Sequence, residues 1–181
     1  MSKRILISGG HGKLNSKLLE VNSSNILLLP DKSEMDITQL SDVEKVIKDF
    51  GPTHFLHTAA ITRPMAIHEK DPSISIATNI IGTANCAIAC IAANVKLIYI
   101  STDFVYPGIS GVNPFTNYGW SKLGGECSAR MSPDNLILRL AMCQKPFPHP
   151  KALVDMIKSP IYVEDVAKII FQLIDEKGII N

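Results

Sequence analysis

The chain has 181 residues and a formal net charge of +1, with 46% hydrophobic and 19% charged residues. This length suits one domain, and the apolar content is too high for a disordered chain. The near-neutral charge gives no reason to expect nucleic acid or an anionic membrane surface as a partner. The N-terminus enters an apolar run within four residues, so we predict no signal peptide and expect a cytoplasmic protein.

The four cysteines, Cys86, Cys90, Cys127 and Cys143, form no C-x-x-C pair. Because no histidine–cysteine pair lies at zinc spacing around them, the sequence predicts no metal site. We expect reduced, buried thiols, which is the usual state of cysteines in a cytosolic protein.

Short apolar runs alternate along the chain with segments of helical spacing. Since parallel strands need crossover connections, this alternation predicts an α/β fold with a doubly wound parallel sheet. Strands are expected at residues 5–8, 26–29, 55–58, 97–101 and 136–140. Helices are expected at residues 12–20, 39–49, 73–93, 117–130 and 163–176. Either Thr38 or Ser41 could cap the second helix.

The longest apolar stretch, residues 73–94, has about the length of one membrane span. Its Ser, Thr, Gly and two internal Asn residues make exposure to lipid costly, and Asp71-Pro72 is a start typical of a soluble helix. We therefore expect this helix to press on the sheet or on a partner chain rather than to enter a membrane.

The stretch SGGHGKLNS, residues 8–16, follows the first apolar run and precedes a helix. Gly9 and Gly12 would allow a tight turn and close approach of backbone N–H groups to a phosphate at the positive end of the helix dipole. Asn15 stands where the G-x-x-G-x-x-G form of this loop has its last glycine, so we expect weakened packing, with the helix start slightly off the sheet. The alternative is that these glycines simply end a strand.

An acidic residue that reads the ribose of a dinucleotide is expected about 20 residues after such a loop. Asp31 lies there, at the end of the second apolar run. Lys32 and Ser33 lie beside it and could instead bind a 2′-phosphate. The alternative is that Asp31 is an ordinary surface turn residue.

The stretch YGWSK, residues 118–122, heads the fourth predicted helix. The i, i+4 spacing places Tyr118 and Lys122 on one helix face, where an ammonium would lower the pKa of the phenol towards working pH. Thr102 and Asp103 end an apolar strand, so a hydroxyl there could bind a substrate carbonyl. The alternative is that Tyr118 is an amphipathic aromatic residue and Lys122 a solvated charge.

These motifs together carry a resemblance. The glycine loop, HTAAITRP (57–64), NIIGT (79–83), STDFVYPG (101–108) and PFTNYGWSKLGGE (114–126) occur in the order found in the extended short-chain dehydrogenase/reductase superfamily. The last two most resemble the dTDP-4-dehydrorhamnose reductase family. The resemblance implies a Rossmann-type fold and NADPH- or NADH-dependent reduction of a nucleotide-linked 4-keto-6-deoxy sugar.

The resemblance also implies roles for the matching residues. Tyr118 would protonate the incoming alkoxide, and Lys122 would lower its pKa and bind the nicotinamide ribose. Thr102 would polarise the keto oxygen, with Asp103 in the same pocket. Asn79 would support the site. Independently of the resemblance, the charge of Arg63 after AAIT could meet a substrate phosphate. Cofactor binding would fall to Gly9, Gly12, Lys13, Leu14, Asp31, Lys32, Asp36, Ile37, Ala59, Ala60, Thr62, Tyr118 and Lys122.

The substrate side is shorter than this family usually has. We expect a single domain, with a Rossmann core at residues 1–140 and a reduced, truncated substrate-binding segment at 141–181. The intact Tyr, Lys and Thr set favours a reductase, and the short segment favours a non-catalytic NAD(P)-binding regulatory or partner protein. A nucleotide-sugar epimerase is a further alternative.

Helices 73–93 and 117–130 correspond to those that often pair in dimers of this superfamily, so a homodimer is expected. Trp120 would then pack or contact the second copy. His54 and His57 flank a buried strand and are expected to be packed rather than to bind a metal, and His11 is expected to be exposed.

Overall fold

A parallel sheet of six strands, in the order β2-β1-β3-β4-β5-β8, forms the centre of the molecule. The computed structural model describes residues 2–106, 111–146 and 159–181. The strands are β1 (Arg4–Ile7), β2 (Ile26–Leu28), β3 (His54–His57), β4 (Lys96–Thr102), β5 (Asn135–Leu140) and β8 (Gly178–Ile180). The predicted doubly wound α/β fold is confirmed, and the strand order reverses between β1 and β3, where ligands bind in such sheets.

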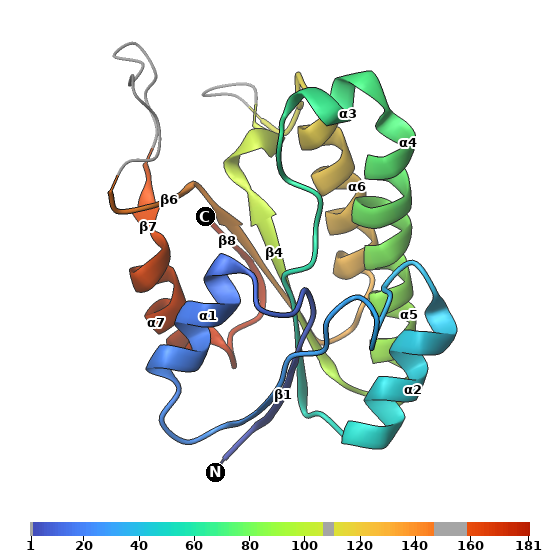
Figure 1. Ribbon diagram of the computed structural model, residues 1–181, viewed down its shortest axis with the longest axis vertical. Helices are drawn as coiled ribbons and strands as arrows, with labels where there is room; N and C mark the ends of the chain where they lie inside the picture. Colours follow the sequence, from blue (N-terminus) through green and yellow to red (C-terminus); the bar gives the residue numbers. More distant parts are fainter. Residues whose placement is uncertain (1, 107–110, 147–158) are drawn as a thin grey trace.

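Helices cover both faces of the sheet (Figure 1). One face carries α1 (Lys13–Val21) and α7 (Val163–Leu173), and the other carries α2 (Leu40–Phe50), α5 (Gly82–Ala93) and α6 (Asn117–Arg130). Alternate residues of each strand enter the two cores, so Ile5 and Ile7 pack towards α1 and α7 while Leu6 packs towards α2 and α5. This burial on both faces explains the nearly continuous apolar runs.

The apolar stretch at 73–93 is helical but not one regular α-helix. It consists of α4 (Pro72–Ser75), the π-helical segment η1 (Ile76–Ile81) and α5. Asp71 caps its start by accepting a hydrogen bond from the Ser73 backbone N–H (3.1 Å). Within the described residues, the span Pro72–Ala93 is long and apolar enough to cross a membrane, and 44% of its most apolar window is buried inside the fold.

Several short elements escaped the sequence prediction. They are the helix α3 (Ala66–Lys70), the 3₁₀ turn η2 (Asp103–Val105), and the strands β6 (Met142–Cys143), β7 (Ile161–Tyr162) and β8. None of them lies in one of the apolar runs or helical patterns from which the other elements were predicted. The segment predicted as the reduced substrate side, 141–181, includes residues 147–158, which lie outside the described part of the chain.

The predicted cap of α2 is wrong. Gln39 precedes the helix and its side chain makes no capping hydrogen bond. Thr38 instead donates its hydroxyl to Asp36 Oδ1 (2.8 Å), and Ser41 lies inside the helix. The local turn at Asp36 therefore takes the hydroxyl that could have capped α2.

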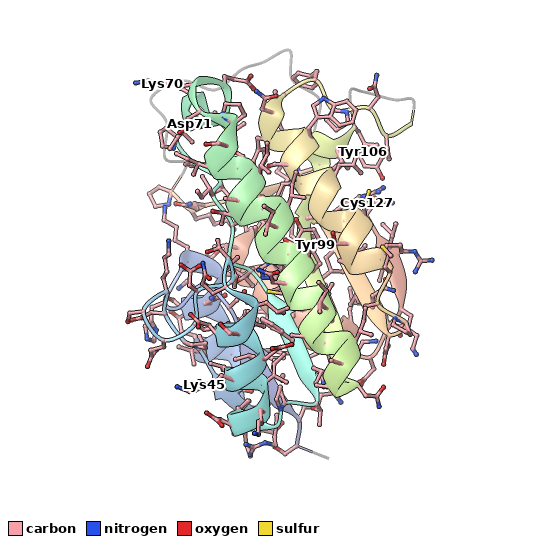
Figure 2. The ribbon with its side chains drawn as sticks, turned by 90° about the vertical axis from the view of Figure 1, so that its right-hand side faces the viewer. Lys45, Lys70, Asp71, Tyr99, Tyr106 and Cys127 are labelled. Atoms are coloured by element: carbon pink, nitrogen blue, oxygen red, sulfur yellow. The ribbon has the colours of Figure 1, made fainter. Side chains whose placement is uncertain are left out.

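The cysteine prediction holds only in part. All four thiols are free, and Cys86 and Cys90 are buried. Cys127, by contrast, is exposed on α6 (Figure 2), and Cys143 is half-buried on β6. Their positions on an outer helix face and in the small second sheet explain the difference.

Candidate active site

The glycine loop brings the backbone of β1 close to the end of β3. Gly9 has φ +89°, and a Cβ there would lie 3.2 Å from the Ala59 Cα, so only glycine fits without strain. Gly12 precedes α1, which has neither a capping side chain nor an acidic residue in its first turn. The N-terminus of α1 therefore offers a positive dipole end to an anion.

Asn15 is part of this loop's framework. Its side chain is 1% exposed and donates to the backbone oxygens of Ser8 (3.0 Å) and Gly10 (2.8 Å). Its Oδ1 accepts from the Thr58 hydroxyl (2.9 Å). The weakened packing expected at Asn15 is therefore wrong, because the amide fills the glycine position with hydrogen bonds to β1, the loop and the end of β3.

The expected ribose-reading residue lies three residues beyond the end of β2. Asp31 Oδ1 accepts hydrogen bonds from the Ser33 hydroxyl (2.6 Å) and backbone N–H (2.7 Å), which lower the pKa of the carboxyl. Lys32 is exposed, and its Nζ lies 3.5 Å from Asp36 Oδ2. Asp31 Oδ1 is thus used in hydrogen bonds within its own turn, while the neighbouring Lys32 side chain is exposed to solvent.

The other predicted cofactor residues divide into core and loop positions. Leu14 and Ile37 are buried in the two cores, and Lys13 donates to Gln144 Oε1 (2.9 Å). The turn at 59–62 is partly exposed, and the Asn79 amide holds it by accepting from the Ile61 N–H (2.9 Å) and donating to the Ile61 oxygen (3.0 Å). Ala59, Ala60 and Thr62 belong to this turn, next to the glycine loop.

A chain of buried hydrogen bonds runs beneath the loop from β1 to α5. The Ser8 hydroxyl accepts from the Thr58 and Ala59 N–H groups (3.1 Å each), so we assign its proton to the bond with His57 Nδ1 (2.8 Å). His57 Nε2–H then donates to Thr83 Oγ1 (3.0 Å). Complete burial lowers the pKa of His57 to about 3, so the ring is neutral. The expectation of a packed histidine is confirmed.

Asn79 extends this polar framework to α6. Thr83 donates to the Asn79 backbone oxygen (2.8 Å), and Asn79 Nδ2 donates to Ser121 Oγ (2.9 Å). Ser121 lies between Tyr118 and Lys122 on α6, and its hydroxyl donates to the backbone carbonyl oxygen of Tyr118 (2.8 Å). The glycine loop and the predicted catalytic helix therefore share one buried hydrogen-bond network.

Tyr118 lies at the second position of α6, which Thr116 caps by accepting from the Gly119 N–H (3.1 Å). The Tyr118 side chain is buried, and the Thr102 hydroxyl at the carboxyl end of β4 acts on its phenol. Burial raises the pKa of Tyr118, and the Thr102 hydroxyl and, to a smaller extent, the Arg63 charge oppose that shift. Thr102 also donates to Asp103 Oδ1 (3.1 Å). The structure thus brings together Tyr118, Thr102, Asp103 and Arg63.

Lys122 is buried and turned towards the sheet. Its Nζ donates to the Ile100 oxygen (2.7 Å) and lies 4.1 Å from the centre of the Tyr99 ring. Burial lowers the pKa of Lys122 to about 7, and the Glu126 charge partly opposes this shift. The alternative of a solvated Lys122 is therefore wrong. The expected downward pKa shift of Tyr118 is also wrong, because burial prevails there and the nearby cation is Arg63.

Three charged or polar residues around the site were not predicted from the sequence. Glu126 accepts from the Ser101 hydroxyl (2.5 Å) and forms a buried ion pair with Arg139 (2.7 Å). His68, from α3, contacts the Tyr118 ring. Glu126 lies four residues after Lys122, so helical spacing alone could have indicated it. His68 belongs to an element too short to show a pattern.

The model of the RmlD substrate binding domain matches residues 3–145 of the chain. The chain belongs to this family. Among the relatives of this RmlD-family chain is the dTDP-4-dehydrorhamnose reductase of Aggregatibacter actinomycetemcomitans, which is 28% identical over 96% of the chain and 68% of its own length. Another is the methionine adenosyltransferase 2 subunit beta of Xenopus tropicalis, 26% identical over 97% of the chain. The chain spans 63% of the length of that relative.

Solved structures of similar proteins share the fold of this RmlD-family chain. The dTDP-4-dehydrorhamnose reductase from Bacillus anthracis, in complex with NADP, has a TM-score of 0.86 and 28% identity, covering 99% of this chain and 73% of the other. The Bordetella bronchiseptica enzyme WbmG, in complex with NAD, has a TM-score of 0.78 and 25% identity, covering 100% and 72%. The Rossmann-type fold predicted from the motifs is confirmed.

Proposed function

We propose that the chain is an NAD(P)H-dependent reductase of a dTDP-linked 4-keto-6-deoxy sugar. The observation that carries this proposal is the meeting of Tyr118, Thr102 and Arg63 at the carboxyl end of β4, on the same sheet edge as the glycine loop. Relatives named dTDP-4-dehydrorhamnose reductase support the substrate class. The proposal extends to the whole reaction although the chain spans only part of those relatives.

The residues present fit a dinucleotide. The position of Gly9 against Ala59 and the uncapped N-terminus of α1 form a cradle that a pyrophosphate would complete. Lys32 would pair with a 2′-phosphate, because its ammonium is exposed while Asp31 is engaged by Ser33. NADPH is therefore the first cofactor to test, with NADH beside it. The reduced nicotinamide would supply a hydride to the carbonyl carbon.

Each residue near β4 then has a defined part. Thr102 would hold the carbonyl oxygen, and the Tyr118 phenol would donate its proton to that oxygen as the alkoxide forms. The single hydroxyl proton of Thr102, which Asp103 Oδ1 accepts in this structure, would turn to the carbonyl oxygen when the substrate binds, with Asp103 beside it in the pocket. Arg63 would bind a phosphate of the nucleotide and favours the Tyr118 phenolate after proton transfer. Lys122 would contact the nicotinamide ribose only after leaving the Ile100 oxygen.

A second candidate function is a non-catalytic regulatory subunit that binds a dinucleotide. The relatives named methionine adenosyltransferase 2 subunit beta favour it, since they match 97% of the chain at 26% identity. The inward direction of Lys122 also favours it. The two candidates differ in one measurable property, which is turnover that depends on Tyr118.

The proposal includes a homodimer in the cytoplasm. Ile88, Ile91 and Trp120 are each about half exposed on α5 and α6 and would pack against a second copy of the chain. We further propose that residues 1–181 act as one dinucleotide-binding unit. Sedimentation of the wild type and of an Ile88→Lys variant would test the dimer, with a lower sedimentation coefficient expected for the variant.

The test of function combines cofactor binding with turnover. NADPH and NADH are titrated by fluorescence, and reduction of dTDP-4-dehydrorhamnose is followed by loss of absorbance of the reduced nicotinamide. Tyr118→Phe should lower kcat by about 10²–10⁴-fold and leave cofactor binding unchanged. Tyr162→Phe removes a phenol hydroxyl outside the proposed site and should keep wild-type turnover. Tight binding without Tyr118-dependent turnover would favour the regulatory candidate, and absence of binding would exclude both.

A further inference from the structure

The short helix α3 holds the beginning of α6. Glu69 Oε1 accepts from the Asn117 backbone N–H (2.9 Å), and Oε2 accepts from the Asn117 side-chain amide (2.8 Å). The same amide donates to the His68 oxygen (3.2 Å). Figure 1 shows α3 at the end of the sheet where α6 begins, and Lys70 and Asp71 mark this end in Figure 2. Asn117 directly precedes Tyr118, so α3 is anchored one residue from the proposed acid.

His68 projects from α3 onto Tyr118. Its side chain is 0% exposed, and the centres of the two rings lie 5.0 Å apart at an angle of 51°. Phe104 contacts the same phenol ring edge-on, with ring centres 5.6 Å apart. The Tyr118 ring is therefore held between α3 and η2, and the Thr102 hydroxyl at the end of β4 acts on its phenol. His68 is the only one of these contacts contributed by α3.

The chemistry of the imidazole shows why a histidine occupies this position. Its Nδ1 lies 2.7 Å from the Ser75 hydroxyl, and both side chains are buried. Its Nε2 is buried with no hydrogen-bond partner among the described residues. A purely apolar ring would pack against Tyr118 without this unpaired nitrogen. The imidazole combines a flat ring for Tyr118 with a nitrogen that fixes the plane of that ring against α4.

We propose that His68 is a positioning residue for Tyr118: the Ser75 bond sets the plane of the imidazole, and the imidazole keeps the phenol ring in place beside η2 and shielded from water. This inference rests on the proposed function for its effect on turnover. Its effect on the phenol itself does not depend on that function. Burial is the main cause that raises the pKa of Tyr118, so removing the His68 ring should admit water and bring this pKa back towards its ordinary value.

The first measurement is the ionisation of Tyr118. Ultraviolet difference titration of the wild type and His68→Leu, each with the spectrum of its Tyr118→Phe counterpart subtracted, isolates this phenol among the four tyrosines. His68→Leu should titrate at lower pH than the wild type. Asp103 and Arg63, whose charges act on the phenol, are present in both proteins. His68→Phe keeps a flat ring and should titrate nearer the wild type than His68→Leu.

The second measurement separates positioning from general folding. With dTDP-4-dehydrorhamnose, His68→Leu should lower kcat about 10- to 100-fold and leave KM for NADPH unchanged, because misplacement of a reacting group costs rate rather than binding. Lys70→Ala, on the exposed side of α3, is the matched control and should retain wild-type values. Circular dichroism establishes that each variant is folded.

The two measurements keep this inference distinct from the proposed function. If the wild type has no turnover but His68→Leu lowers the Tyr118 titration, the proposed function fails and the positioning of Tyr118 stands. If His68→Leu titrates as the wild type does, or if a folded His68→Phe shifts the titration as far as His68→Leu, the ring is not what holds Tyr118 and the inference is overturned.

Discussion

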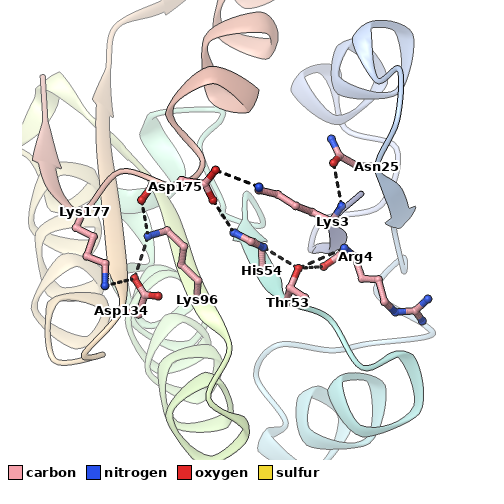
Figure 3. Close-up of polar contacts among 9 residues, drawn as sticks. All are labelled: Lys3, Arg4, Asn25, Thr53, His54, Lys96, Asp134, Asp175 and Lys177. Atoms are coloured by element: carbon pink, nitrogen blue, oxygen red, sulfur yellow. Dashed lines mark hydrogen bonds and ion pairs between the residues drawn. The ribbon is translucent and has the colours of Figure 1, made fainter. Parts of the chain in front are cut away.

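The carboxyl ends and the amino ends of the parallel strands, here called the carboxyl edge and the amino edge of the sheet, are stabilised by different kinds of interaction. At the carboxyl edge, Ser8, His57 and Thr83 are completely buried and joined by hydrogen bonds between neutral groups. At the amino edge, Asp175 is 70% exposed and pairs with Lys3 Nζ (3.0 Å) and His54 Nε2 (3.5 Å), as Figure 3 shows. The first edge positions the site, and the second ties the beginnings of strands to the residues that follow α7.

The difference has an energetic consequence. A buried donor or acceptor that loses its partner costs about 1–3 kcal/mol, whereas an exposed ion pair contributes about 0–1 kcal/mol and is screened by salt. Substitutions at the carboxyl edge should therefore cost more than chemically similar ones at the amino edge. The polar contacts whose loss costs most stability therefore lie where the proposed chemistry takes place.

Replacement of His57 should have the largest effect. His57→Leu leaves the Ser8 hydroxyl without its acceptor and should lower the free energy of unfolding by about 2–4 kcal/mol at pH 7. Lys3→Ala, at the amino edge, removes the ion pair with the exposed Asp175 and should cost less than about 1 kcal/mol. Urea denaturation compares the pair, and equal losses would contradict the contrast between the edges.

The acid side of the stability curve provides a check on His57. Burial lowers its pKa to about 3, while the unfolded chain titrates near pH 6.5. Below about pH 6.5 the unfolded state binds one more proton at this position, so stability falls as pH falls towards 3. His57→Leu should show a shallower fall over this range than the wild type.

Restoring the glycine at position 15 should be the next largest change. Asn15→Gly removes the hydrogen bonds to Ser8, Gly10 and Thr58 and should destabilise the protein by about 1–3 kcal/mol. Asn25→Gly, near the amino edge, is the matched control and should cost about half as much or less. Thermal denaturation checks both. A more stable Asn15→Gly protein would show that the motif's usual glycine packs better than this amide.

Two buried lysines at opposite ends of β4 sharpen the comparison further. Below pH 7 the Lys122 ammonium is charged and buried, and no carboxylate of the described residues forms an ion pair with it. Lys122→Met should therefore stabilise the fold by about 1–2 kcal/mol at pH 6 while abolishing turnover. Lys96→Met instead breaks the ion pair with Asp134 (2.9 Å) and should destabilise it. Denaturation of both variants at pH 6 gives the comparison.

The pH dependence of the stability difference between Lys122→Met and the wild type shows whether burial of the ammonium causes it. Lys122 titrates at about pH 7 when folded and near 10.4 when unfolded, so the unfolded state binds more protons between these values. Wild-type stability at this position therefore rises with pH over that range, and the advantage of Lys122→Met should shrink towards pH 10. An advantage that grows with pH would contradict burial of the ammonium as its origin.

The smallest effect is expected at Asp175. Lys3 holds the pKa of this carboxyl below its usual range, so the pair contributes only above about pH 4 and is lost as pH falls further. Asp175→Asn should cost less than about 1 kcal/mol at pH 7, because the carboxyl is largely exposed. Denaturation in 0.05 M and 1 M salt should show a difference from the wild type only at low salt.

Local sequence was sufficient for the long elements and for the motifs. Helix 117–130 was predicted with the bounds of α6, and the five predicted strands all lie in the sheet. Strands that are buried on both faces need apolar residues at nearly every position, so the sequence shows them as continuous apolar runs. The i, i+4 spacing places Tyr118 and Lys122 on one face of a helix. The elements α3 and β8 were missed because neither was recognised as an apolar run or a helical pattern, whereas β2, which is as short as β8, was predicted from the run at 26–29.

The sequence by itself therefore determined the α/β order, the glycine loop and the placement of Tyr118 and Lys122 on one helix. Only the tertiary structure decided which way Lys122 points, that Asn15 is buried in the loop, and that His68 lies against the phenol. These three outcomes depend on contacts between segments far apart along the chain. The direction of a side chain and the pKa it acquires follow from what surrounds it, and spacing along one helix cannot specify those surroundings.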